Sequence, residues 1–102
     1  MTQQLKQELA SMIGPAEWQT LLPHAARDSV VLVNPGLDLA DVGVAVATDN
    51  VSSVQRWISE ALITKPTVEQ LEYWERDRSR QFQALIVQPY VLIQGTESDD
   101  AV

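Results

Sequence analysis

The residues that could carry out chemistry in this 102-residue chain begin with its single histidine, His24. Histidine titrates near neutral pH and can act as a general base. Arg27 and Asp28 follow shortly after it, and they could either bind an anion or form an ordinary polar loop. Because the sequence positions no partner for His24, the favoured interpretation is a histidine near a helix end that is hydrogen-bonded to a carbonyl.

A second candidate group consists of four aspartates in a stretch without lysine or arginine: Asp28, Asp38, Asp41 and Asp49. Carboxylate oxygens are the ligands that Mg²⁺ and Ca²⁺ prefer. Their spacing does not match a calcium-binding loop, which alternates acidic residues around a central glycine. Asp38 and Asp49 instead precede expected helices, where they would cap backbone N–H groups, and Asp41 would lie in a first helical turn. Capping is therefore favoured, and no metal or other cofactor is expected.

Tryptophan and tyrosine are the third group, because they pack in cores and also anchor interfaces. Trp57 and Trp74 lie on the apolar faces of expected helices, which favours core positions. Trp18 and Tyr90 lie near prolines at the ends of expected elements, and they are the better candidates for an interface.

The composition excludes several classes of protein. The chain has no cysteine, which excludes a disulfide scaffold, a thiolate metal site and a cysteine nucleophile. Its four glycines form no phosphate-binding loop, nucleophile elbow or dinucleotide fingerprint. A formal net charge of −7 disfavours binding to nucleic acid through its phosphates.

No targeting segment is apparent in the sequence. Residues 1–7 are polar, and the longest apolar runs fall far short of the roughly 20 residues that cross a bilayer. We therefore expect a soluble cytoplasmic protein that binds neither a membrane nor nucleic acid.

The helices are the elements that the sequence marks most clearly. The first is indicated by apolar residues at helical spacing: Leu5, Leu9, Met12 and Ile13. Gly14 and Pro15 are expected to end it, and Pro15 then begins a short second helix over 16–22, which Pro23 bends or closes. Residues 39–47 could form a helix capped by Asp38 or a strand of alternating valines, and their length favours the helix.

Two further helices are predicted from spacing and caps. The apolar stripe of the first, capped by Asp49 or Asn50, is expected to face the core: Val51, Val54, Trp57, Ile58, Ala61 and Leu62. The last helix begins at Thr67, which forms a capping box with Gln70.

The expected strands are few. Residues 29–33 form a buried strand, and Ile63 and Thr64 add a short one at an edge. A two-residue hairpin between residues 84–87 and 90–93 would need a positive φ that Pro89 cannot adopt, so these residues are predicted to form one long strand, bent or bulged at Pro89.

The predicted fold class is therefore α+β, with about five helices packed on a small sheet of two to three strands. That sheet would contain Val30–Val33 and Ala84–Ile93. We expect a single domain over residues 1–94, followed by an acidic flexible tail over 95–102.

The chain also resembles a known family in several runs of residues: Pro23-His24-Ala25-Ala26-Arg27, Val30 to Leu39 with its Leu-Asp-Leu patch, Ala45-Val46-Ala47, Trp57, and the closing Pro89-Tyr90-Val91-Leu92-Ile93-Gln94. The resemblance extends from about Leu5 to Gln94 and is to domain of unknown function 2288, a bacterial family of about 100 residues. Members often have tryptophan at the position of Tyr90. The resemblance implies a bacterial cytoplasmic protein and transfers neither an activity nor a catalytic residue.

Two hypotheses about function remain. The favoured one is a non-catalytic protein-interaction or regulatory module that binds an unidentified protein or pairs as a homodimer, with Trp18 and Tyr90 as candidate contact residues. The alternative is a small enzyme or divalent-metal-binding domain that uses one cleft, formed by His24, Arg27, Asp38 and Asp41. The alternative requires the imidazole to lie within hydrogen-bond reach of the carboxylates or of the substrate between them.

Overall fold

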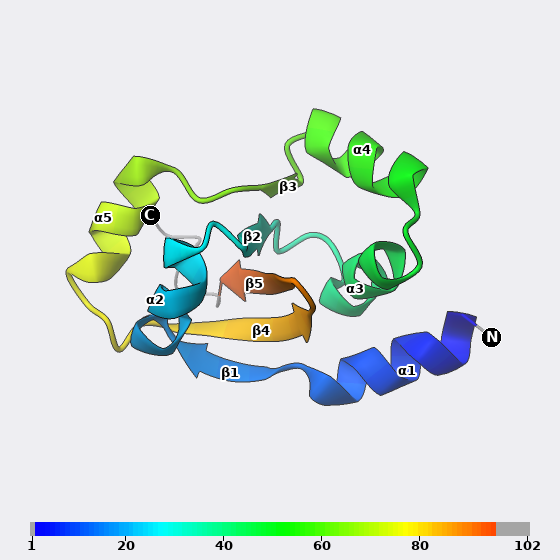
Figure 1. Ribbon diagram of the computed structural model, residues 1–102, viewed down its shortest axis with the longest axis horizontal. Helices are drawn as coiled ribbons and strands as arrows, with labels where there is room; N and C mark the ends of the chain where they lie inside the picture. Colours follow the sequence, from blue (N-terminus) through cyan, green and yellow to red (C-terminus); the bar gives the residue numbers. More distant parts are fainter. Residues whose placement is uncertain (1, 96–102) are drawn as a thin grey trace.

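The structure is a computed structural model that describes residues 2–95, with side chains from residue 4 onward (Figure 1). Apart from Gly95, the residues of the expected acidic tail lie outside the described part of the chain. The described elements, in chain order, are α1 (Thr2–Met12), β1 (Gly14–Glu17), α2 (Trp18–Ala26), β2 (Val30–Val33), α3 (Leu39–Ala47), α4 (Val51–Ser59), β3 (Ile63–Thr64), α5 (Val68–Glu75), β4 (Gln81–Val87) and β5 (Tyr90–Gly95).

The five strands described form one mixed sheet in the order β1-β4-β5-β2-β3. Strands β2 and β5 are parallel, with Val30 opposite Val91, and the other neighbours are antiparallel. The predicted α+β class and the five helices are confirmed over the described residues. The expected two to three strands were too few, because β1 was not predicted and the last strand is in fact two.

Helices cover both faces of this sheet, because side chains that alternate along each strand are apolar on both sides. Helices α1 and α3 pack on one face, and α2 and α5 pack on the other; Figure 1 shows α1, α3 and α4 at one end of the sheet and α5 at the other. The core of the first face contains Leu9, Val33, Leu39, Val42, Ile63, Leu85, Val87 and Leu92. The core of the second face contains Trp18, Leu21, Val30, Trp74, Phe82, Val91 and Ile93.

Strand β1 replaces the expected start of the second helix. Pro15 does not begin a helix but lies in the edge strand β1, opposite Gln83 of β4. An edge strand tolerates proline because one side of it needs no ladder hydrogen bonds. Helix α2 starts three residues later at Trp18, whose N–H donates to the carbonyl of Arg80 at 2.8 Å, and it continues past Pro23 to Ala26.

The prediction of one long strand bent at Pro89 was wrong. Strands β4 and β5 form an antiparallel hairpin in which Val87 pairs with Tyr90. The peptide bond between Gln88 and Pro89 is cis. A turn with a cis proline in its third position reverses the chain without the positive φ that the other tight hairpin turns require.

The predicted helix caps are largely confirmed. The Asp38 carboxylate accepts from the N–H of Ala40 at 2.9 Å and caps α3, which settles residues 39–47 as a helix. Asn50, not Asp49, caps α4. Asp49 instead has a φ of 58° and ends α3. The capping box is present, with Thr67 and Gln70 at its two positions.

No helix within residues 2–95 combines the length and the apolar character that crossing a membrane requires.

Candidate functional site

His24 lies half-buried in the last turn of α2, where its carbonyl oxygen helps to end the helix. Its carbonyl oxygen accepts hydrogen bonds from the N–H of Arg27 and of Ser29, both at 3.1 Å, and from the hydroxyl of Ser29 at 2.9 Å. Arg27 is the exposed C-cap residue of the same helix. These bonds end α2 and turn the chain into β2.

Asp38 and Asp41 face α1 rather than α2. Lys6 of α1 places its Nζ atom 2.8 Å from Asp41 and 3.6 Å from Asp38. The hydrogen bond with Asp41 is the main reason why the pKa of Lys6 is raised above its ordinary value. These contacts tie α1 to the start of α3, which is a structural use of both carboxylates.

The expected cleft is therefore not assembled. His24 and Arg27 belong to α2, and Asp38 and Asp41 belong to α3, which packs on the opposite face of the sheet. The Asp28 carboxylate does not join Asp38 and Asp41 either, because it pairs with Lys65, whose Nζ atom lies 2.6 Å away. Over the described part of the chain, no three side chains of the histidine, aspartate or glutamate type gather as a metal site would require.

Trp18 lies in the core, where it contacts other aromatic rings. Its ring centroid is 4.9 Å from that of Trp74 and 6.1 Å from that of Phe82. With only 1% of its surface exposed, Trp18 offers nothing to a partner in this structure. Trp74 is also buried, as expected, and Trp57 packs half-buried against the other core.

Tyr90 lies at the surface and borders an apolar groove that the sequence did not reveal. The groove has a volume of about 420 Å³ and lies between α4 and the sheet. Apolar side chains of the sheet and of α3 line it: Val31, Val46, Ile63 and Leu92. Three large exposed hydrophobic side chains also line it, with Val51 at 52%, Ile58 at 56% and Tyr90 at 41% exposure.

Helix α4 explains why the groove is open. None of its residues is buried. Val54 and Trp57 pack half-buried against the core of the first face, as expected, whereas Val51 and Ile58 are exposed and line this groove. The helical spacing of these residues was visible in the sequence. What the sequence does not state is whether another element of the chain covers them.

Few charged residues line the groove. Among the described residues that line it, Asp49 and Lys65 are the charged ones. Lys65 pairs with Asp28, so the apolar surface is bordered by one acid and one compensated base. The lining of the groove is thus mostly apolar, on a chain with a net charge of −7.

Comparisons with known proteins agree with this architecture. The NMR solution structure of PA1075 from Pseudomonas aeruginosa is similar, with a TM-score of 0.77 and 30% sequence identity over 93% of this chain and 88% of that chain. A search of curated proteins found no match. The model of the family described as "Protein of unknown function (DUF2288)" matches residues 4–95. The expected family is confirmed by this match, and the chain belongs to the DUF2288 family.

Proposed function

We propose that this protein is a non-catalytic interaction module that pairs with a second copy of itself through the groove beside α4. The observation that supports this most strongly is the pair of exposed apolar side chains on α4, Val51 and Ile58, which line the groove. Large exposed apolar areas on folded proteins commonly mark interaction sites. Tyr90 adds an aromatic side chain of the kind that contributes most binding energy at interfaces.

A second copy is the occupant that the charge distribution favours. Two chains of net charge −7 repel each other over most of their surfaces. The groove is an area where apolar side chains gather, and Lys65 at its border is already paired with Asp28. In a twofold contact both copies use the same surface, so the exposed apolar side chains of one groove would cover those of the other.

The chain contains a well-matched pair of substitutions to test this proposal. Val51 is the first residue of α4 and Val68 is the first residue of α5; both are exposed, and both follow a side-chain cap. Aspartate is well tolerated in the first turn of a helix, so neither Val51→Asp nor Val68→Asp should unfold the protein. Only Val51→Asp places a charge in the groove.

Sedimentation velocity over a concentration series measures the outcome. We expect the wild type and Val68→Asp to form dimers and Val51→Asp to remain a monomer at the same concentrations. A wild type that is monomeric up to about 1 mM, where even contacts of about 4 kcal/mol are detected, overturns the proposal. Dimers that persist in Val51→Asp and also in Ile58→Asp overturn it as well, because the pairing then uses another surface.

A further inference from the structure

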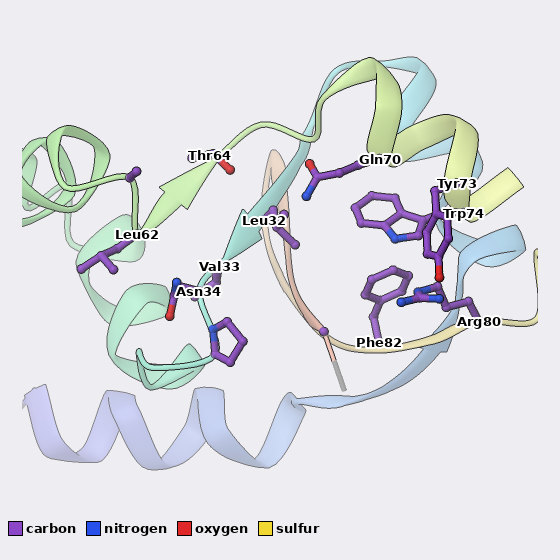
Figure 2. A pocket seen from close by; sticks show the side chains of 13 residues that line it. Leu32, Val33, Asn34, Leu62, Thr64, Gln70, Tyr73, Trp74, Arg80 and Phe82 are labelled. Carbon is purple, nitrogen blue, oxygen red and sulfur yellow. The ribbon is translucent and has the colours of Figure 1, made fainter. Parts of the chain in front are cut away.

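Strand β3 is an edge of the sheet, and its outer side faces no other strand of residues 2–95. Its inner side pairs with β2, with Thr64 opposite Leu32 and Ile63 opposite Val33. Figure 2 shows Leu32 and Thr64 on these two strands, beside a second hollow of about 430 Å³. Thr64 is exposed and lines both this hollow and the groove beside α4, so the edge is accessible at Thr64 from two sides.

The register identifies which backbone groups point outward from β3. The N–H of Asn34 donates to the carbonyl of Leu62 at 2.8 Å across the two strands. In an antiparallel pair every second residue bonds to the neighbouring strand, so Thr64 also directs its N–H and C=O toward β2. The residues on either side of it, Ile63 and Lys65, therefore direct theirs to the outer edge, away from β2.

This outer edge is short, because the chain limits it at both ends. Pro66 has no N–H to donate, and it restricts Lys65 before it to an extended conformation. At the other end, Ala61 has a φ of 59°, and its N–H donates to the carbonyl of Ile58 in α4 at 3.0 Å. The edge therefore presents the backbone groups of Ile63 and Lys65. A short edge next to lysine and proline resists arbitrary strands, so a partner has to match this register.

We propose that β3 pairs with the β3 of a second copy, antiparallel about a twofold axis at Thr64. In this register Ile63 of each copy lies opposite Lys65 of the other, and every outward N–H of these residues meets an outward C=O. Lys65 carries the one charge of residues 62–67, and the Asp28 carboxylate lies 2.6 Å from its Nζ atom, so the edges meet without uncompensated like charges. The inference rests on the pairing proposed above and adds a strand register to it.

The same axis brings the two copies of α4 together. Helix α4 lies on the first face of the sheet, because Val54 and Trp57 pack against the core of that face, and Figure 1 shows it next to β3. A twofold axis perpendicular to the sheet at its edge keeps this face on the same side in both copies. The exposed Val51 and Ile58 of one α4 therefore lie toward those of the other, so strand pairing and burial of the groove act in one contact.

A single introduced cysteine tests the register, because the chain has no cysteine of its own. Thr64 would face its counterpart in a pair without mutual hydrogen bonds, where the Cα atoms are about 4.5 Å apart and a disulfide fits. We expect oxidised Thr64→Cys to form a disulfide-linked dimer at concentrations at which the wild type pairs. The control is Ser11→Cys, at an exposed position of α1 that leads into β1 at the opposite edge of the sheet. It should be linked at least about tenfold more slowly, because its thiols meet only by random collision.

Sedimentation velocity of the wild type under the same conditions separates this inference from the proposed function. A dimeric wild type, together with a Thr64→Cys variant that is linked no faster than Ser11→Cys, overturns the strand register and leaves pairing through the groove in place. A wild type that stays monomeric up to about 1 mM overturns both.

Removal of the outward N–H of residue 65 is an independent test that leaves the bonds to β2 intact. Lys65→Pro removes this N–H together with the amine, whereas Lys65→Ala removes the amine alone and is the matched control. Proline is tolerated in an edge strand, so both variants should fold, which circular dichroism checks. We expect the dimer of Lys65→Pro to have a Kd at least about tenfold above that of Lys65→Ala. Equal Kd values in two folded variants contradict the register.

Discussion

Gly43 of α3 lies so close to Leu85 of β4 that a Cβ atom on the glycine would come within 2.6 Å of Leu85 Cδ2. The same atom would lie 3.4 Å from Leu9 Cδ1 on α1. Glycine within a helix costs about 1 kcal/mol relative to alanine. Because Gly43 has no side chain, α3 can lie close to the sheet, and Leu39 and Val42 pack in one apolar cluster with Leu85.

Gly43→Ala is therefore predicted to lower the free energy of unfolding by about 1 kcal/mol. The gain in helix propensity, about 1 kcal/mol, is smaller than the cost of overpacking, about 1–3 kcal/mol. In a Leu85→Val background the shorter side chain makes room, and the same substitution should stabilise by about 0.5–1 kcal/mol. Urea denaturation of the four chains in this double-mutant cycle measures the coupling.

The control for this cycle is Ile86→Val, a similar truncation at an exposed position on the same strand. Gly43→Ala should remain destabilising in that background. If its effect has the same sign and size in the Leu85→Val background as in the wild type, the close approach is not the reason for glycine at this position.

Local signals in the sequence were sufficient for the helices and most of their caps. The bonds that form the capping box link Thr67 and Gln70, which are three residues apart, and the Asp38 cap reaches only to Ala40. Interactions of this range depend on the residue types of near neighbours. They are therefore readable without any knowledge of the tertiary fold.

The missing strands depended on partners far along the chain. Nothing near Pro15 indicates that it lies opposite Gln83, which is distant in sequence. Because the cis form is the minor isomer before proline, the hairpin at Pro89 was equally invisible. Tertiary pairing overrode the local preferences at both positions.

The candidate site, like the fold, was predicted only in its local features. The apolar stripe of Val51 and Ile58 was correctly placed on a helix, but whether it is covered depends on the packing of the whole chain. His24 and Asp38 are near neighbours in the sequence, but strand β2 lies between them in the chain. Helix α2, before this strand, packs on one face of the sheet, and α3, after it, packs on the other. Sequence proximity therefore suggested a cleft that the topology excludes.

The turn between α5 and β4 predicts a pH dependence that can be tested. The Asp77 carboxylate accepts from the hydroxyl of Ser79 at 2.5 Å and from its N–H at 3.1 Å. These bonds, the hydroxyl first, hold the pKa of Asp77 below its ordinary value of 3.8. A carboxyl group with a lowered pKa stabilises the fold above its unfolded pKa, and this contribution is lost as the pH falls through the folded value.

Asp77→Asn keeps an oxygen acceptor but removes the charge, so it imitates the protonated state. We expect this variant to be less stable than the wild type at neutral pH, and the difference to shrink as the pH falls below 3.8. Urea midpoints of both chains over a pH series measure it. A difference between the two chains that stays constant over the pH series would contradict the linkage.

Trp18 provides the last prediction, because it combines a large apolar ring with a buried donor. Its Nε1 atom is buried and has no hydrogen-bond partner in the described structure, although its ring packs against Trp74 and Phe82. An unsatisfied buried donor costs about 1–3 kcal/mol, so Trp18→Phe should recover most of what it loses in packing. We expect it to destabilise by less than about 1.5 kcal/mol, against about 3–5 kcal/mol for Trp18→Ala. Urea unfolding followed by far-UV circular dichroism, which does not depend on the removed fluorophore, measures both losses; a loss well above about 1.5 kcal/mol for Trp18→Phe would mean that the buried indole N–H carries no such penalty.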